Sequence, residues 1–418
     1  MLNSSFIKKE FPLFSQPQYQ DLVYLDSSAT TQKPQKVISA INDFYFHNNA
    51  NPGRSVHTLA QESTKILTES RQTIASFFGA KDQELILTRN TTEAINGVAL
   101  GWARHQVNAD DVILSSLLEH HSNFVVWQQV CAEKNAKLEL ATLTADGQIN
   151  ISDLEQKLKQ HSPKLLALTH LSNVTGGYLD LHYLVKMVKK TSPTTRILID
   201  GAQSAGRIKI DFDQLGIDFY AFSGHKMYGP MGIGGLLVKE QILREGEMKP
   251  WLFGGGMIDE VHPQFSTFHA DSQQRFTAGT VDVASTVGLA TACTYLLEME
   301  MNEVLEHEQQ LARFALEKLG SVNDLEVCGP SLVEQLGEYQ LKRFGPVSFF
   351  HHKYQAHDIA QVLNHHHIAV RSGHHCCMPL HSHYHWPATV RVSFGVYSDQ
   401  KDIEKLIDVV THLNRYLG

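Results

Sequence analysis

The first two thirds of the chain alternate short apolar runs with segments of helical periodicity. The apolar runs show no polar alternation, so each is typical of a strand covered on both faces of a parallel sheet. We therefore expect a mostly parallel α/β sheet. The predicted strands are ELILTR (84–89), DVILSS (111–116), KLLALTH (164–170), RILID (196–200), FYAF (219–222) and GIGGLLV (232–238).

The pattern changes from about Ala284, where two long helical segments begin, at 284–300 and 303–320. Strand-like and helical runs follow them and predict a small α+β domain. We expect an N-terminal segment (1–20) that joins the small domain or a dimer surface. A large cofactor-binding domain (21–283) follows, and then the linking helices with the small C-terminal domain (284–418). Clefts between such domains often bind ligands.

Charge and cysteine content exclude several classes of protein. The 418 residues contain 36 Lys and Arg against 44 Asp and Glu, which gives a net charge of −8 without a basic run, so no nucleic-acid partner is expected. The charged start of the chain and the lack of a long apolar run predict a cytoplasmic protein with no membrane partner. Five scattered cysteines are too few for a disulfide framework, so we expect thiols.

Two residues that end neighbouring predicted strands favour an aldehyde cofactor. Lys226 follows the run FYAF, and a desolvated lysine amine can form a Schiff base. Asp200 ends RILID and could keep the pyridinium nitrogen of pyridoxal phosphate protonated. The carboxyl ends of parallel strands meet at one edge of a sheet. The alternatives are an exposed loop lysine and a carboxylate that caps the turn after Asp200.

Polar residues around this edge could bind the phosphate and the ring of the cofactor. Thr91 and Thr92 open a predicted helix after ELILTR, where hydroxyl and amide groups suit a phosphate or simply cap the helix. Ser223 and His225 flank the lysine. His120 could stack on a planar ring and move protons, or it could be a solvated loop side chain.

These motifs together resemble one known family across nearly the whole chain. The family is the group II cysteine desulfurases of the SufS and CsdA type, which are class V aminotransferase-like enzymes of the fold-type-I pyridoxal phosphate group. The matching motifs are LDSSATT (25–31), TTE (91–93), EHH (119–121), SNV (172–174), DGAQ (200–203), SGHK (223–226), RSGHHC (371–376) and Arg391.

The resemblance implies a role for each matching residue. Lys226 forms the Schiff base, Asp200 pairs with the ring nitrogen and His120 stacks on the ring. Asn173 and Gln203 bond ring substituents, and Asn173 also faces the substrate. The implied phosphate ligands are Thr91, Thr92, Ser223, His225 and Thr280, the last reaching the partner subunit of a homodimer.

The remaining roles concern the substrate and the sulfur. Cys376 is the implied nucleophile, with the preceding histidine pair available to stabilise its thiolate. Arg391 binds the substrate carboxylate, and Arg371 is the competing candidate. Cys377, which stands where alanine is common, is a packing residue or a persulfide relay.

The implied reaction converts L-cysteine to L-alanine and leaves the sulfur on the enzyme as a persulfide. A protein acceptor of the SufE or CsdE kind, or a scaffold, would take the sulfur for iron–sulfur cluster assembly or another use. A selenocysteine lyase or another class V enzyme stays open as an alternative, as does the choice between the SufS and CsdA pathways.

Three departures from the family pattern and one remote alternative complete the analysis. Gly53 stands where histidine is usual, FGGGM (253–257) lacks the usual polar residue before Met, and Cys377 is the third departure. The alternative is a metal-binding protein, suggested by the crowding of His and Cys. The spacing matches no tetrahedral zinc pattern, so we expect no metal. The crowded residues are His374, His375, Cys376, Cys377, His381, His383 and His385, with 365–367 nearby.

Overall fold

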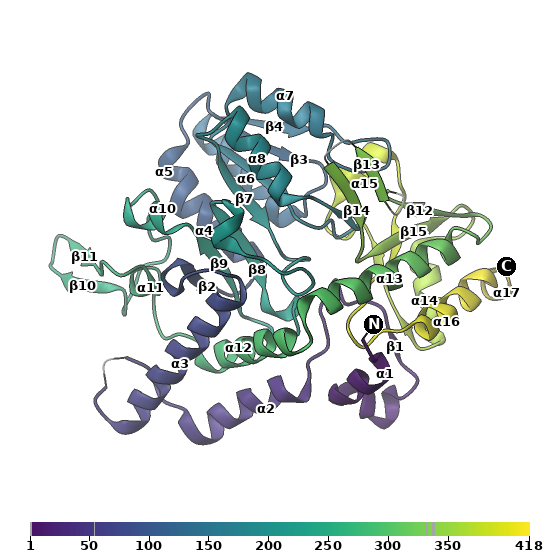
Figure 1. The fold of residues 1–418 in the computed structure, drawn as a ribbon, viewed down its shortest axis with the longest axis horizontal. Coiled ribbons are helices and arrows are strands. Elements are labelled where there is room, and N and C mark those ends of the chain that lie inside the picture. The colour runs from purple at the N-terminus through teal and green to yellow at the C-terminus, as the bar shows by residue number, and fades with distance from the viewer. Residues whose placement is uncertain (1, 54, 331–332, 337–338) are drawn as a thin grey trace.

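The computed structural model describes residues 2–53, 55–330, 333–336 and 339–418, and within them a seven-stranded sheet forms the centre (Figure 1). The strand order is β2-β9-β8-β7-β5-β3-β4. Neighbouring strands from β8 to β4 run parallel, and β9 runs antiparallel to both of its neighbours. The strands are β2 (Leu85–Thr88), β3 (Val112–Ser116), β4 (Lys137–Ala141), β5 (Leu165–Thr169), β7 (Arg196–Asp200), β8 (Phe219–Ser223) and β9 (Gly234–Val238).

All six predicted strands of this sheet are present, and β4 is the one that the pattern missed. Its sequence KLELA is exposed or half-buried except at Ala141, as expected of an edge strand, so it lacks a continuous apolar run. The other strands pack on both faces. Leu166 and Leu168 of β5 belong to one apolar cluster, whereas Leu165 and Ala167 belong to the other.

Helices cover the two faces of this sheet and account for that double burial. One cluster includes side chains of α3 (Thr58–Phe77), α7 (Ile151–His161) and α8 (Leu181–Thr191). The other includes side chains of α4 (Thr91–Val98), α6 (Val125–Lys134) and α10 (Glu240–Arg244). The continuous apolar runs are therefore explained by burial on both sides. Shorter helices in this region are α5 (Arg104–Gln106), α9 (Phe212–Leu215) and α11 (Ser272–Arg275).

Two long helices lead from the large sheet to the C-terminal part, as Figure 1 shows. The first, α12 (Val283–Glu298), packs on α3 and on α2 (Gln35–Asp43). The second, α13 (Met301–Leu319), packs on β12 (Leu325–Cys328), β15 (Val347–His351) and α16 (Gln400–Thr411). The two helices correspond to the helical segments predicted at 284–300 and 303–320.

The C-terminal part contains an antiparallel sheet of order β12-β15-β18-β17. The helical pattern DIEKLIDVVTHLNRYL predicts one helix over 402–417, but a turn at 412–413 divides it into two helices, α16 and α17. The elements are β12 (Leu325–Cys328), β15 (Val347–His351), α14 (Ala356–His365), β17 (Arg371–Gly373), α15 (Met378–Tyr384), β18 (Thr389–Val392), α16 (Gln400–Thr411) and α17 (Asn414–Leu417).

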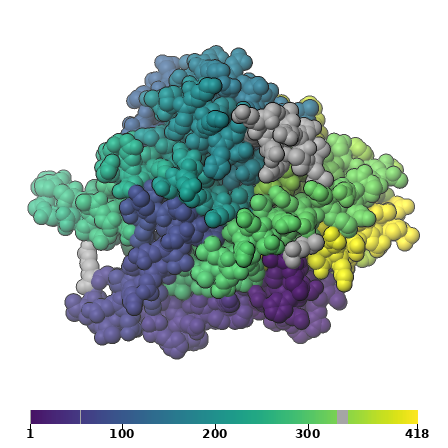
Figure 2. Space-filling view, viewed as in Figure 1, coloured from purple at the N-terminus to yellow at the C-terminus, as the bar shows by residue number. Residues whose placement is uncertain are grey.

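The N-terminal segment lies against the C-terminal part (Figures 1 and 2). The helix α1 (Ser4–Ile7) precedes Lys8, whose Nζ is 3.7 Å from Asp402 Oδ1. The ring of Phe11 packs edge-on against Tyr397 at 4.8 Å between centroids. Strand β1 (Val23–Tyr24) pairs in parallel with β16 (Ile368–Ala369). The division at residues 20 and 283 stays a prediction.

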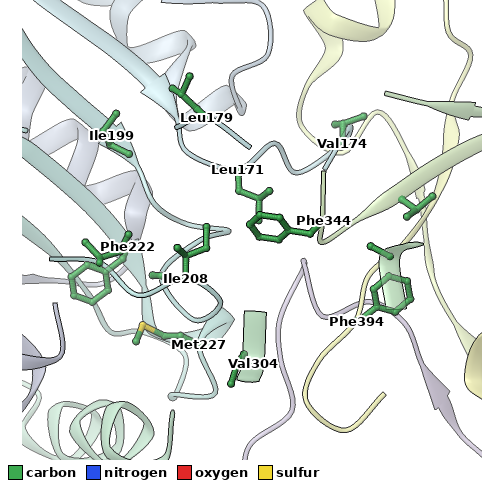
Figure 3. Packing of buried hydrophobic residues seen from close by; sticks show 14 of the residues in the cluster. Leu171, Val174, Leu179, Ile199, Ile208, Phe222, Met227, Val304, Phe344 and Phe394 are labelled. Atoms are coloured by element: carbon green, nitrogen blue, oxygen red, sulfur yellow. The ribbon is translucent and has the colours of Figure 1, made fainter. Parts of the chain in front are cut away.

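One apolar cluster joins the two parts of the molecule. It includes Leu171 and Val174, which follow β5, together with Phe344 and Phe394 from the C-terminal part (Figure 3). A further sheet contains β6 (Gly177–Tyr178), β13 (Val333–Leu336) and β14 (Tyr339–Arg343). The hairpin of β10 (Ile258–Val261) and β11 (Ser266–Phe268) projects from the body. None of the described helices combines the length and apolar character needed to cross a bilayer.

Candidate active site

A cavity of about 260 Å³ lies at the carboxyl ends of β7 and β8 and is closed by residues of β17 and β18. It gathers residues that are up to 363 positions apart in sequence, from Ser28 to Arg391. The predicted site residues that line it are Thr91, Thr92, His120, Asn173, Asp200, Gln203, Ser223, His225, Lys226, Arg371 and Arg391. Cys376 adjoins the cavity through Arg371, and Thr280 does not line it.

Lys226 lies in a short turn of 3₁₀ helix that follows β8. Desolvation of its amine lowers the pKa of Lys226 to about 8, although the charge of Asp200 opposes this shift. The effect follows from placing a lysine at the end of a buried strand, where water is scarce. The uncharged fraction of the amine near neutral pH is therefore larger than that of an ordinary lysine.

Asp200 caps the turn that follows β7 and also faces the cavity. Its Oδ1 accepts a hydrogen bond of 2.9 Å from the Ala202 N–H, so it caps the turn. The side chain also lines the cavity and is only 3% exposed. Burial raises the pKa of Asp200, while the Ala202 N–H and the Lys226 charge lower it. A cation placed in the cavity would stabilise the carboxylate.

Polar groups suited to an anion meet at the start of α4. The N–H and the hydroxyl of Thr91 lie 2.8 Å and 2.7 Å from Ser223 Oγ. Nδ1 of His225 is buried and has no hydrogen-bond partner among the described residues. Burial lowers the pKa of His225 to about 4, so its ring is neutral and has an N–H to donate. The helix start and this unused group fit a phosphate.

His120 is held with one ring nitrogen already bonded. Its Nδ1 lies 3.1 Å from the Ser122 N–H, so the proton of the neutral ring is assigned to Nε2. Burial, followed by the charge of Lys226, lowers the pKa of His120 to about 3. The Ser122 hydroxyl also lies 2.7 Å from Thr92 Oγ1. Sequence reasoning missed Ser122, for which proximity to His120 was the only signal.

The side-chain amide of Gln203 is oriented by a buried ion pair. Its Nε2 donates to the Ser28 carbonyl at 2.9 Å, and its Oε1 accepts from Arg207 Nη1 at 3.1 Å. Arg207 pairs with Glu308 of α13 at 2.7 Å, and both side chains are buried. One N–H of Gln203 is left for a ligand. Sequence reasoning missed Arg207 and Glu308 because they belong to no motif.

Arg391 of β18 is buried and joins the antiparallel sheet to residues that follow β1 and β5. Its Nη2 lies 3.2 Å from Asp26 Oδ1, and its Nη1 donates to the Asn173 carbonyl at 3.2 Å. Burial lowers the pKa of Arg391 to about 10, against the opposing charge of Asp26. Nε has no partner among the described residues, so part of the guanidinium is available to a ligand.

Cys376 lies in a loop beside the cavity, with Arg371 Nη2 3.7 Å from its Sγ. Asn173 Nδ2 donates to the His375 carbonyl at 2.8 Å, so this amide anchors the loop as well as lining the cavity. His375 and Cys376 have φ of 52° and 57°, so the loop is not extended at these residues. Cys377 nevertheless points away: it is buried, and its Sγ lies 3.2 Å from the Glu119 carbonyl.

Thr280 and two of the departures from the family pattern lie at another cavity. This second cavity, of about 1110 Å³, is lined by Gly53, Gly255, Gly256 and Thr280 among others, beside the β10–β11 hairpin. Thr280 is exposed there. Neither departure contacts the cavity that contains Lys226.

The crowded histidines form no metal site in the described part of the chain. No group of three or more His, Cys, Asp or Glu side chains there could hold a metal ion. Some of these rings have other partners: His375 Nε2 lies 2.9 Å from Thr389 Oγ1, and His381 Nδ1 lies 3.0 Å from the Cys377 carbonyl. The metal-binding alternative has no support in this geometry.

Comparison with known proteins agrees with this arrangement. Residues 23–406 match the aminotransferase class-V family. A cysteine desulfurase of Escherichia coli O17:K52:H18 is 38% identical over 414 residues, which cover 99% of this chain and 98% of that protein. The apo structure of a cysteine desulfurase from Thermococcus onnurineus NA1 superposes with a TM-score of 0.91 at 33% identity, covering 100% of this chain and 99% of that one.

A second solved structure gives the same result. It is the cysteine desulfurase CsdA from Escherichia coli in an S-sulfonic acid form, with a TM-score of 0.87 at 32% identity and complete coverage of both chains. The chain belongs to the aminotransferase class-V family. Within it, the protein is a full-length homologue of cysteine desulfurases. The predicted family and its fold-type-I α/β architecture are confirmed.

Proposed function

We propose that the protein is a pyridoxal 5′-phosphate-dependent cysteine desulfurase that transfers the sulfur of L-cysteine to Cys376. One observation carries the proposal. A single cavity is lined by Asp200 and Lys226, which lie at the ends of adjacent parallel strands, and by Arg371 and Arg391. Cys376 lies at its edge, beside Arg371. The activity of the relatives named above supports it.

The cavity residues fit the cofactor. Asp200 can face a protonated ring nitrogen. The start of α4 at Thr91 suits a phosphate, as does Nδ1 of His225, which has no partner among the described residues. When bound, pyridoxal phosphate supplies an aldehyde for the substrate amine and a ring that delocalises the electron pair left at Cα. Lys226 would hold the cofactor, with His120 and Gln203 against its ring.

The chain's own residues would prepare the substrate. Arg391 is proposed to bind the cysteine carboxylate through the part of its guanidinium that Asp26 and Asn173 leave free. Lys226 would then take the Cα proton, which its lowered pKa of about 8 allows near neutral pH.

The sulfur transfer balances without another oxidant. The Cys376 thiolate attacks the substrate sulfur, a new S–S bond forms, and the Cβ–S bond breaks. The electron pair of that bond stays on the carbon skeleton, which takes up protons and leaves as alanine. Cysteine plus a protein thiol thus give alanine plus a protein persulfide.

The persulfide must be passed on, so we propose that a protein acceptor of the SufE or CsdE kind, or a scaffold, receives the sulfur for iron–sulfur cluster assembly or another use. A cytoplasmic location suits this chemistry, because a reducing compartment keeps Cys376 available as a thiol. All five cysteines are free in the structure.

We also propose a homodimer in which Thr280 reaches the phosphate site of the partner subunit. Thr280 is exposed and lies outside the cavity of its own chain. Exposed large apolar side chains include Phe46, in the helical turn Phe44–Asn48 that continues α2, and Phe253, Val261 and Phe265, in and around the β10–β11 hairpin. Such side chains are expected of a surface that a second copy covers.

The test is an assay of the purified protein with L-cysteine and pyridoxal phosphate. Equimolar alanine and sulfide in the presence of a reductant are expected, and Cys376→Ser should release neither above background. The same assay is run with selenocysteine as the substrate in place of cysteine. Alanine formation from selenocysteine alone would reject the proposal in favour of a lyase.

A further inference from the structure

The loop that presents Cys376 is in a conformation that its own residues disfavour. His375 and Cys376 are consecutive non-glycine residues with φ of 52° and 57°. A side chain with a Cβ rarely adopts this left-handed region, so contacts from outside the loop must hold it there. The nucleophile's position therefore depends on the residues that bind this loop.

The segment 119–121 supplies those contacts one after another. The Cys377 Sγ lies 3.2 Å from the Glu119 carbonyl. The His121 N–H donates to the Cys376 carbonyl at 2.8 Å. The Met378 N–H donates to Nε2 of the His121 ring at 3.1 Å. Three consecutive residues, from Cys376 to Met378, are thus bonded to one short segment.

His121 contributes two of these three bonds and has no place in the steps described above. Its ring bonds the first residue of α15, and its backbone bonds the nucleophile itself. His121 also directly follows His120, which lines the cavity. The same dipeptide therefore contacts the cofactor site and the loop of the nucleophile.

We propose that His121 is a positioning residue whose imidazole Nε2 accepts the Met378 N–H and so holds the Cys376 backbone at the mouth of the cavity. This role deepens the proposed desulfurase function and rests on it. Sulfur attack needs Sγ close to the substrate sulfur, and a loop that departs from that position loses rate without losing cofactor or substrate affinity.

Two kinds of variant distinguish the loss of the hydrogen-bond acceptor at position 121 from the loss of the side chain's bulk. His121→Phe keeps a planar ring without an acceptor, and His121→Ala is a second variant without one. His121→Gln has an amide oxygen that can accept the Met378 N–H. His383→Phe, an exposed ring on α15, is the matched control for changing a histidine next to the loop.

The first measurement needs no turnover. Hydrogen–deuterium exchange of the pyridoxal phosphate-loaded protein, without substrate, should be faster over 376–380 by roughly tenfold in His121→Phe and His121→Ala, the factor expected from one lost hydrogen bond. His121→Gln and His383→Phe should exchange within about twofold of the unchanged protein. Equal exchange in all variants would overturn the proposal.

The second measurement is steady-state sulfide release. In His121→Phe and His121→Ala, kcat should fall by roughly tenfold while KM and the visible cofactor absorbance stay unchanged, and His121→Gln should recover most of the loss. An equal fall of kcat in His121→Gln and His121→Phe, or a loss of cofactor absorbance, would contradict the positioning role of His121. If the unchanged protein makes no sulfide, the proposed function fails, and the exchange comparison still decides the role of His121.

Discussion

The guanidinium of Arg371 lies beside the nucleophile, with Nη2 3.7 Å from the Sγ of Cys376. The neighbouring histidine does not supply the charge that the sequence suggested, because burial lowers the pKa of His375 to about 2 and its ring is neutral. The Arg371 guanidinium is placed to attract the negative charge of a thiolate at Sγ.

Replacing this cation should slow the reactions of the Cys376 thiol. Arg371→Gln is expected to reduce the rate of Cys376 alkylation by iodoacetamide at neutral pH roughly tenfold, because a nearby positive charge favours the reactive anion. Arg371→Lys should keep part of the rate. Mass spectrometry of the modified peptide measures it, with exposed Arg415→Gln as the control. An unchanged rate in Arg371→Gln would contradict the assignment.

The second prediction concerns the pH at which Lys226 becomes reactive. Its pKa is lowered from 10.5 to about 8 by desolvation, and only the uncharged amine attacks an aldehyde. The rate at which the apoprotein takes up pyridoxal phosphate should therefore rise with pH up to about 8 and then level off.

Absorbance after rapid mixing with pyridoxal phosphate measures this rate. Lys226→Ala is the control and should develop no lysine-linked visible band. A rate that still climbs toward the ordinary lysine pKa of 10.5 would show that the folded protein does not desolvate this amine.

The strand-end residues could be predicted from the sequence because their placement depends on local pattern. Asp200 and Lys226 each follow a continuous apolar run, and parallel strands bring such ends together. The resemblance to a family then supplied a place for Cys376 and Arg391. Thr280 could be named in the same way, although its own chain places it at another cavity.

The remaining parts of the site depend on contacts between distant segments. The Arg391–Asp26 pair joins residues 365 positions apart, and the Arg207–Glu308 pair joins a loop to a helix of the domain link. The left-handed conformation of Cys376 follows from bonds made by 119–121 and Asn173. No pattern within the loop itself encodes these partners, so periodicity and motif spacing could not predict them.

The third prediction tests Arg391 as the carboxylate anchor. Removing one partner of a buried charged pair costs about 2–5 kcal/mol, so Arg391→Ala should reduce kcat/KM for cysteine at least roughly tenfold. Part of this loss reflects Asp26, a half-buried carboxylate that would lose its cation. The double variant Asp26→Asn/Arg391→Ala leaves no unpaired carboxylate, so the loss of kcat/KM that remains in it reflects substrate binding. If Arg391→Ala leaves kcat/KM for cysteine unchanged while Arg371→Ala lowers it strongly, Arg371 is the carboxylate anchor instead.

The fourth prediction tests whether Thr280 serves the partner subunit. Lys226→Ala should be inactive, and Thr280→Ala should bind cofactor more weakly. When the two variants are mixed, a dimer can form from one subunit of each. In such a dimer, one site would take Lys226 from the Thr280→Ala subunit and Thr280 from the Lys226→Ala subunit, so it would be intact. Sulfide release by the mixture should therefore exceed the average of the two separate variants. Sedimentation measures the dimer. A mixture that shows only the average activity after subunit exchange would place Thr280 outside the partner's site.

The last prediction separates the two adjacent thiols. Cys377 is fully buried and its pKa is raised by burial, so it stays a protonated thiol, whereas Cys376 is partly exposed beside Arg371. Cys376→Ser should abolish sulfide release and keep the visible cofactor absorbance, and Cys377→Ala should keep most of the activity because alanine fits in the space of a buried cysteine. Mass spectrometry after cysteine addition without reductant should find about 32 Da on the Cys376 side chain for each added sulfur. The same mass on Cys377, or wild-type turnover by Cys376→Ser, would show that the nucleophile is assigned to the wrong residue while leaving the cofactor site unaffected.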